Sequence, residues 1–275
     1  MTTEERASQS RTETIAVEAG HRLLRWWPPK EPAHASLVIV HGYAEHGGRY
    51  EKVGAQLAGA GVAAWAMDLL GHGASSGERA SVPSLDALVR DASLLLERAR
   101  AARPALALFV LGHSMGGLVA TALALERQGE LAGLILSGAA VGDPSALEPL
   151  LDLDPLPEVV LSSELLSRDP RVAEDYDRDP LNYRGPFKRE TLRALTSGAR
   201  AVRARFPELT LPLLVLHGGD DQLVVPQASE DLYAGAASSD KRLEILPGLR
   251  HEILNEPEGP ELTGRIAAWI AERAR

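Results

Sequence analysis

The segment that most strongly indicates the fold of this chain is 105–128, with the sequence ALALFVLGHSMGGLVATALALERQ. The first seven are almost all apolar, as in a strand buried on both faces, and Met115 to Gln128 have the composition of a helix. Between them Gly112-His113-Ser114-Met115-Gly116 matches the pattern G-x-S-x-G. In a strand-turn-helix context this pattern predicts a tight, strained turn that presents a serine at the C-terminal edge of a sheet. Glycines flank the serine because side chains there would clash where the strand and the helix cross.

Strand-like and helix-like segments also alternate on both sides of this turn, which is typical of a parallel sheet covered by helices. Upstream, we expect a hairpin at 13–27, strands at 36–40 and 62–68, and helices at 49–60 and 83–103, with Pro83 in the first turn of the latter. Downstream, we expect strands at 131–136, 211–216 and 242–246, and helices at 226–236 and 257–273. The sequence therefore predicts an α/β fold with a mostly parallel central sheet and helices on both faces.

The alternation stops between about residues 141 and 206, where the chain is rich in Pro and Asp and predicts only short helical pieces. We therefore expect one catalytic domain, 1–140 and 207–275, with a cap inserted at 141–206. Apolar residues cluster in this cap. They suit a tunnel for an acyl chain, because each buried methylene contributes ~0.8 kcal/mol. Packing of the cap onto the domain explains them equally well.

Ser114 needs a base to remove its proton, and the base needs an acid to orient it. In folds with this turn, the chain order is serine, acid, base. Of the eight histidines, only His217 and His251 follow the cap, and only His251 also follows a plausible acid. His251 is therefore the predicted base. Asp220 and Asp221, in the turn after 211–216, are both candidates for the acid, and the local sequence does not separate them.

Two backbone N–H groups are expected to stabilise the negative charge that develops on an attacked carbonyl oxygen. One belongs to Met115, which follows the serine. The other is expected from Tyr43, in the loop 41–44 after the strand 36–40. Because only backbone N–H groups take part, the identity of the side chains at these two positions says little about whether they form the oxyanion site.

Composition excludes several classes of function. The chain has 275 residues, 45% of them hydrophobic, a net charge of −9 and no cysteine. An acidic balance argues against a nucleic-acid partner, and the lack of cysteine excludes disulfides and thiolate sites. We see no secretory signal and no run of ~18 apolar residues, so we expect a cytoplasmic protein. Its oligomeric state is not predicted, and transient contact with a lipid surface stays open.

No metal or cofactor is expected. The segment that begins His251-Glu252 lacks the second histidine of H-E-x-x-H, so it does not predict a zinc site.

Several motifs together resemble the monoacylglycerol lipase and lysophospholipase group of the α/β-hydrolase superfamily. They are the segment 41–46 with Arg49-Tyr50, Asp68 with 71–73 and 75–79, the turn 112–117, and Asp179 to Tyr183 in the cap. The resemblance implies a serine hydrolase that cleaves esters of single-chain lipids, first of all monoacylglycerol, through an acyl-enzyme. It also implies Asp221 as the acid, from the pattern H-G-x-x-D.

Other roles in the site follow from these motifs and from the cap. Glu45 and Arg49 are expected to pair and brace their loop, and His72 and His113 to form structural hydrogen bonds beneath the site. The cap residues expected to line the substrate site are Leu156, Val159, Val160, Leu165 and Asn182.

Other functions remain open alternatives. A lysophospholipase or a short- or medium-chain carboxylesterase would use the same chemistry. An aminopeptidase-like hydrolase would need a carboxylate for the substrate amine, and Glu158, Glu164 and Glu174 are candidates. A non-catalytic ligand-binding homologue is disfavoured because Ser114, Asp221 and His251 are all present. Dehalogenases and epoxide hydrolases of this fold carry an aspartate in place of the serine.

Overall fold

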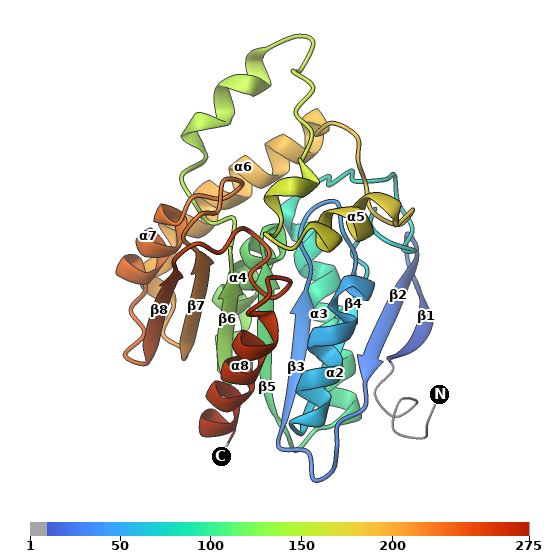
Figure 1. Cartoon of the computed structure of the whole chain (residues 1–275), viewed down its shortest axis with the longest axis vertical. Coiled ribbons are helices and arrows are strands. Elements are labelled where there is room, and N and C mark those ends of the chain that lie inside the picture. Colours follow the sequence, from blue (N-terminus) through green and yellow to red (C-terminus); the bar gives the residue numbers. More distant parts are fainter. Residues whose placement is uncertain (1–9, 275) are drawn as a thin grey trace.

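The computed structural model describes residues 10–274, which form an eight-stranded sheet between helices (Figure 1). The strand order is β1-β2-β4-β3-β5-β6-β7-β8. The strands from β4 to β8 run parallel, whereas β1 and β2 form an antiparallel hairpin that joins the edge at β4. The mostly parallel sheet predicted from the alternation is confirmed. The strands are β1 (Arg11–Val17), β2 (Gly20–Trp27), β3 (Ala35–Val40), β4 (Val62–Met67), β5 (Ala107–His113), β6 (Gly133–Ser137), β7 (Leu213–Gly218) and β8 (Lys241–Leu246).

Helices cover both faces of the sheet, as predicted. Figure 1 shows α2 (Glu51–Gly59) and α8 (Gly259–Arg273) in front of the sheet and α3 (Leu85–Ala102) and α4 (Met115–Arg127) behind it. A further helix, α7 (Gln227–Gly235), lies between β7 and β8 in the chain. No helix within residues 10–274 combines the length and the apolar composition needed to cross a membrane.

The start of α3 differs from the prediction. Pro83 was expected in its first turn, but the helix begins at Leu85, and Ser84 is its N-cap residue. The Ser84 hydroxyl accepts a hydrogen bond from the Ala87 N–H at 3.2 Å. A serine that satisfies a free N–H at a helix start is a strong cap, so the helix begins after Ser84 and leaves Pro83 outside.

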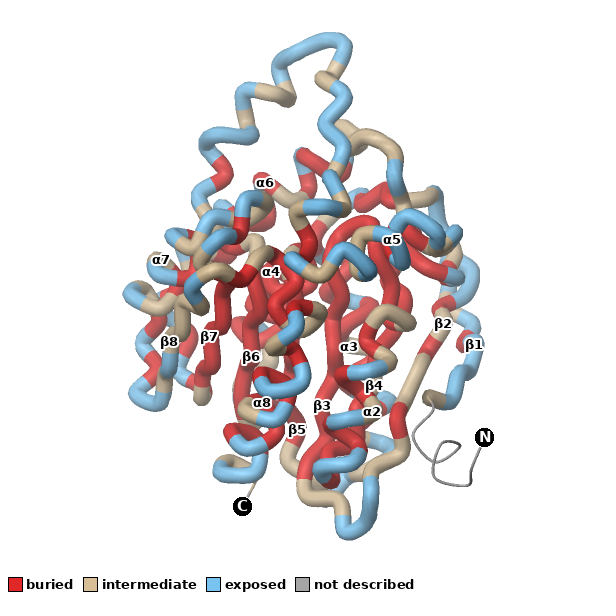
Figure 2. The backbone as a smooth tube through the Cα atoms, viewed as in Figure 1, coloured by how far each residue is buried: buried red, intermediate tan, exposed pale blue. Residues whose placement is uncertain are grey.

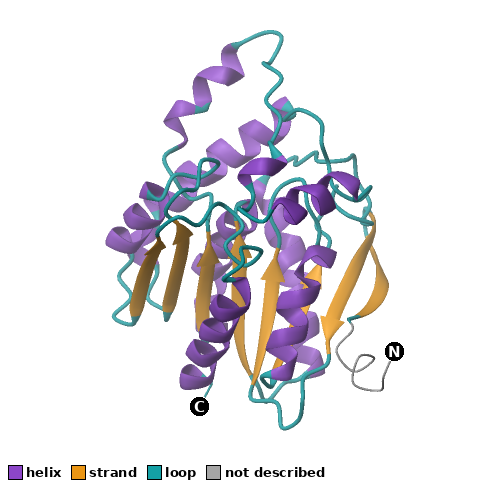
Figure 3. Cartoon of the chain, in the orientation of Figure 1, coloured by secondary structure: helices purple, strands orange, loops and turns teal. Residues whose placement is uncertain are grey.

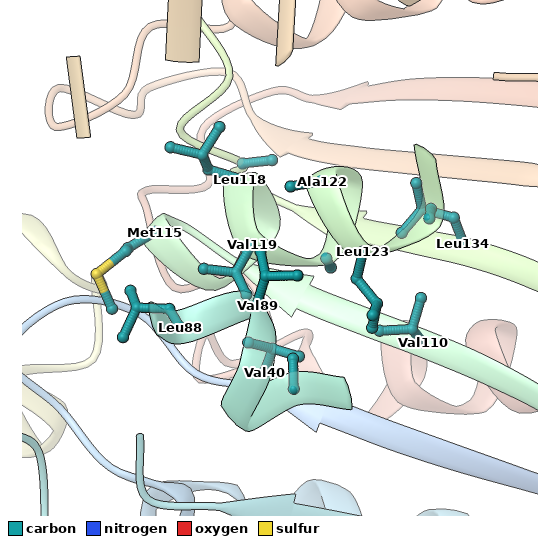
Figure 4. Packing of buried hydrophobic residues seen from close by; sticks show 14 of the residues in the cluster. Val40, Leu88, Val89, Val110, Met115, Leu118, Val119, Ala122, Leu123 and Leu134 are labelled. Carbon is teal, nitrogen blue, oxygen red and sulfur yellow. The ribbon is translucent and has the colours of Figure 1, made fainter. Parts of the chain in front are cut away.

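Two of the strands that lead into the site, β3 and β7, are buried on both faces, whereas the edge strand β8 is only partly buried. Every residue of β3 and β7 is buried, as expected for parallel strands beneath two helix layers (Figure 2). Figure 4 shows Val89 of α3 and Val119 of α4 close to Val40 of β3, and Leu123 of α4 close to Val110 of β5. Burial of each such side chain contributes about 1.5–3 kcal/mol. The turn between β5 and α4 thus rests on a close-packed support.

The segment between β6 and β7 contains only helices and turns, and it lies over the C-terminal edge of the sheet (Figure 3). Its α-helices are α5 (Pro170–Arg178) and α6 (Arg189–Ala204). Short 3-10 helices occur at η3 (Pro144–Ala146), η4 (Glu148–Asp152) and η5 (Ser163–Leu165), and η6 (Phe206–Glu208) precedes β7. The division into a catalytic domain and a cap at 141–206 stays a prediction.

Candidate active site

Ser114 occupies a strained turn between β5 and α4. Its φ is 52° and its ψ is −121°, a region that residues other than glycine rarely adopt. A Cβ on Gly112 would lie 2.3 Å from the Gly116 O, and one on Gly116 would lie 2.0 Å from the Val40 O. The start of α4 therefore lies so close to β5 and to the neighbouring strand β3 that only glycine fits at either position. This geometry explains why the pattern has glycines on both sides of the serine.

Asp221 and His251, which follow β7 and β8, form a buried hydrogen-bonded pair. The His251 Nδ1 lies 2.7 Å from the Asp221 Oδ2. The other carboxylate oxygen, Oδ1, accepts hydrogen bonds from the backbone N–H groups of Leu223 at 2.9 Å and Val224 at 3.0 Å. The His217 Nε2 also lies 3.1 Å from Oδ2. The carboxylate is thus held from several sides, with one oxygen directed at the imidazole of His251.

These contacts keep Asp221 ionised. Burial by itself raises the pKa of Asp221, but the hydrogen bonds from His217 and His251 outweigh it and hold that pKa below its usual range. An ionised acceptor keeps the proton of His251 on Nδ1 and leaves Nε2 free to take a proton from a hydroxyl. The neighbouring Asp220 is exposed, and its backbone N–H donates to the Leu249 O at 2.9 Å. The local sequence does not distinguish Asp220 from Asp221, but the geometry does, because Asp221 is buried against His251 and Asp220 is exposed.

The loops that carry Ser114 and His251 meet beside Gly138. The Ser114 N–H donates to the Ser137 O at 3.1 Å. A Cβ on the next residue, Gly138, would lie 3.3 Å from the His251 Nδ1. The ring of His113, which precedes the serine, lies 4.7 Å from the ring of His251, centroid to centroid. Within residues 10–274 the Ser114 hydroxyl makes no hydrogen bond to the imidazole, and in enzymes without substrate this bond is often long and tightens on binding.

The two predicted oxyanion donors lie on segments that adjoin the serine. The Met115 N–H is at the start of α4, and the Tyr43 N–H is in the loop after β3. A Cβ on Gly42, next to Tyr43, would lie 3.2 Å from the Ser114 Cβ, so this loop contacts the serine directly. Among the described residues neither N–H has a hydrogen-bond acceptor. Both are therefore available to a substrate oxygen, and the positive end of the α4 dipole adds to them. Their catalytic role stays a prediction.

A buried ion cluster links the loop after β3 to the loop of His251. The Arg49 Nη1 lies 2.8 Å from the Glu45 Oε2, and its Nη2 lies 2.8 Å from the Glu252 Oε2. Glu45 also accepts from the Gly42 N–H at 2.6 Å and from the Tyr50 hydroxyl at 2.9 Å. Burial raises the pKa of Glu45, but Arg49 outweighs it and lowers that pKa to about 2. The predicted brace of Glu45 and Arg49 is thus observed, and Glu252 is a third member that sequence reasoning missed.

The histidines beneath the site make structural hydrogen bonds, as expected. The His72 Nδ1 donates to the Leu70 O at 2.9 Å, and the His113 Nδ1 donates to the Ser137 O at 2.9 Å. Burial lowers the pKa of His72 to about 3 and also lowers the pKa of His113. Both rings are therefore neutral at pH 7.

The cap residues predicted to line a substrate site differ in how far they are buried. Val159 and Val160 are 44% and 50% exposed, and Leu156 and Leu165 are half-buried. Asn182 is buried, and its Nδ2 donates to the Tyr176 O at 3.0 Å, which is a contact within the cap. The structure does not enclose the two valines, because the upper part of the cap faces solvent (Figure 2). A role of these five residues in substrate binding stays a prediction.

The arrangement of the site suits nucleophilic hydrolysis. A strained serine, a histidine hydrogen-bonded to an ionised carboxylate, and two free N–H donors are the groups that acyl transfer requires. Within residues 10–274 no cluster of three or more His, Asp or Glu side chains has the geometry of a metal site.

Comparison with known proteins places these residues in a family context. Residues 31–258 match the family model described as serine aminopeptidase, S33. The chain is 36% identical over 253 residues to a monoacylglycerol lipase of Mycolicibacterium smegmatis, which covers 89% of this chain and 90% of that protein. It is 32% identical over 278 residues to monoglyceride lipase of Homo sapiens, with 94% and 89% covered. Among solved structures, the monoacylglycerol lipase of Paleococcus ferrophilus superposes with a TM-score of 0.78 at 26% identity, covering 95% of this chain and 99% of the other.

Proposed function

Because the chain belongs to the family described as serine aminopeptidase, S33, of the α/β-hydrolases, we propose that it hydrolyses monoacylglycerol to a fatty acid and glycerol. One observation carries the chemistry: the Asp221–His251 pair lies beside the strained turn that presents Ser114. The ester class comes from the relatives, because the proteins at 36% and 32% identity are named for lipases of this substrate.

The first half of the reaction forms an acyl-enzyme. The Ser114 Oγ attacks the ester carbonyl carbon while the His251 Nε2 takes its proton, and Asp221 stabilises the imidazolium. The N–H groups of Met115 and Tyr43 donate to the oxyanion. The bond to glycerol then breaks, and His251 returns the proton to the glycerol oxygen.

The second half releases the fatty acid. A water molecule gives a proton to the His251 Nε2 and attacks the acyl carbonyl carbon. The same two N–H groups stabilise the second oxyanion. When it collapses, the bond to the Ser114 Oγ breaks, and His251 returns the proton to that oxygen.

The replacement Ser114→Ala tests this chemistry. Loss of the nucleophile should lower kcat for a monoacylglycerol by about a million-fold, measured by release of fatty acid. It should also abolish labelling by a fluorophosphonate probe, whereas circular dichroism should be unchanged. A variant that keeps the wild-type rate would overturn the proposed mechanism.

A substrate panel tests the substrate class. We expect kcat/KM to be higher for a monoacylglycerol than for a lysophospholipid or a short-chain ester with the same leaving-group reactivity. An aminoacyl naphthylamide belongs in the panel because the family is described as aminopeptidase. Preference for the amide would assign the peptidase alternative, and no turnover or labelling at all would assign a non-catalytic binding protein. A cytoplasmic location and transient contact with a lipid surface also stay predictions.

A further inference from the structure

A buried carboxylate next to His251 fastens the loop of this histidine to the cap. Glu256 is 3% exposed. Its Oε1 accepts a hydrogen bond from the backbone N–H of Arg250, directly before His251, at 2.7 Å. Its Oε2 accepts from the Ser167 hydroxyl at 3.1 Å, from the Arg168 backbone N–H at 3.0 Å and from the Arg168 Nε at 3.1 Å. One carboxylate therefore joins two segments that are 88 residues apart.

Other hydrogen bonds join the same two segments. The Glu252 N–H donates to the Leu166 O at 2.7 Å. The Arg250 Nη1 donates to the Ser167 O at 3.1 Å. Contacts to the cap thus lie on both sides of His251 along the chain, and a single oxygen of Glu256 accepts three of these hydrogen bonds.

The position of this carboxylate bears on the chemistry of His251. A buried charge is stabilised only while its donors are in place, and the donors in turn are left unsatisfied if the charge is removed. Without the carboxylate, the backbone N–H of Arg250 would lose its acceptor, and the loop would be held to the cap by fewer hydrogen bonds. Reactive groups in an active site tolerate little displacement, and a shift of about 1 Å lowers the rate by about a hundredfold.

We propose that Glu256 is a positioning residue, which holds the loop 250–256 against the cap segment 166–168 and so directs the imidazole of His251 at Ser114. This inference rests on the proposed function, because it concerns the base of that mechanism. It also makes the cap part of the catalytic geometry. Movement of the segment 166–168 would remove donors from Glu256 and loosen the loop of the base.

The test compares Glu256→Gln with Glu258→Gln. Glu258 is a matched control, because its carboxylate also pairs with Arg168 but is 43% exposed. Within residues 10–274 it accepts no hydrogen bond from the backbone of 250–256. We expect Glu256→Gln to lower kcat for a water-soluble ester at least about tenfold with little change in KM. The rate of Ser114 labelling by a fluorophosphonate should fall by the same factor, since labelling also depends on the base. Glu258→Gln should change both by less than twofold.

A purely structural role for Glu256 predicts a different result. Tm would then fall, but kcat and the labelling rate of the folded enzyme would equal those of Glu258→Gln, and this outcome would overturn the inference. If Glu256→Gln does not fold, the double replacement Ser167→Ala with Arg168→Gln decides, because it removes two cap donors and keeps the carboxylate. Its labelling rate should fall several-fold, and an unchanged rate would count against the inference. Failure of the proposed function would appear separately, as a wild-type protein that neither cleaves esters nor is labelled.

Discussion

Asp220 and Asp221 follow each other in one turn, yet only Asp221 reaches the imidazole of His251. Replacement of Asp221 by Asn would leave the wrong tautomer of His251 facing Ser114, and kcat should fall about 10⁴-fold. Asp220→Asn alters an exposed carboxylate in the same turn and should keep kcat within about twofold, as is usual for surface changes. Ester hydrolysis at pH 7.5 with both variants checks the assignment. The reverse order of effects would show that Asp220 is the acid.

Single residues could be predicted from the sequence where chain order limits the choice. His251 was found because only two histidines follow the cap. Asp221 needed the family pattern, because two acids share its turn and the hydrogen bonds that select one come from other strands. Glu252 and Glu256 were missed because their partners lie 203 and 88 residues away. Their signal in the sequence is the recurrence of glutamate after His251, at 252, 256 and 258, and this spacing alone does not say what each carboxylate contacts.

At the scale of elements, the close approach of α4 to β5 and to the neighbouring strand β3 determines where the serine lies. Gly116→Ala would place a methyl group 2.0 Å from the Val40 O of β3, so the helix would have to move away from β3. We expect the free energy of unfolding to fall by about 3 kcal/mol or more, at the upper end for overpacking. Urea denaturation measures this change, and the fluorophosphonate labelling rate measures the shift of Ser114.

Gly129→Ala is the matched control for this replacement. Apart from its two chain neighbours, no heavy atom of residues 10–274 lies within 4 Å of a Cβ at Gly129, and its φ is not in the left-handed region. Its free energy of unfolding should change by less than about 0.5 kcal/mol. Equal destabilisation by the two alanines would contradict the close approach of α4 to β3.

Most elements of the domain could be predicted, because parallel strands buried on both faces appear as continuous apolar runs. Element ends were less accurate, as at α3, because a single capping hydroxyl outside the apolar pattern sets the start. The segment between β6 and β7 was predicted to hold only short helical pieces, and this was wrong for α6, which has 16 residues. The packing of this segment also depends on contacts such as those of Glu256, which no local pattern encodes.

At the scale of the whole molecule, the buried neutral histidines make stability depend on pH. The pKa of His72 is about 3 in the folded protein, against about 6.5 in an unfolded chain. Below pH 6.5 the unfolded chain therefore binds a proton that the folded protein does not, so stability is complete above this pH and is lost as the pH falls toward 3. Between pH 7.5 and 5 this single group should lower the free energy of unfolding by about 2 kcal/mol.

Unfolding in urea at pH 7.5 and pH 5 measures this effect. His72→Asn keeps a donor for the Leu70 O but does not titrate, so its loss of stability between the two pH values should be about 2 kcal/mol smaller than that of the wild type. His21→Asn, at an exposed histidine, is the control. An equal pH dependence in wild type and His72→Asn would contradict the buried neutral state of His72.

The insertion between β6 and β7 leaves and re-enters the sheet at neighbouring strands. A designer could therefore exchange it for the insertion of a relative, in order to alter specificity, without cutting the sheet. Replacement of the insertion alone would nevertheless fail. Ser167 and Arg168 would be removed with the old insertion, and Glu256, which belongs to the rest of the chain, would lose these hydrogen-bond donors. A working chimera has to transplant both sides of that junction together.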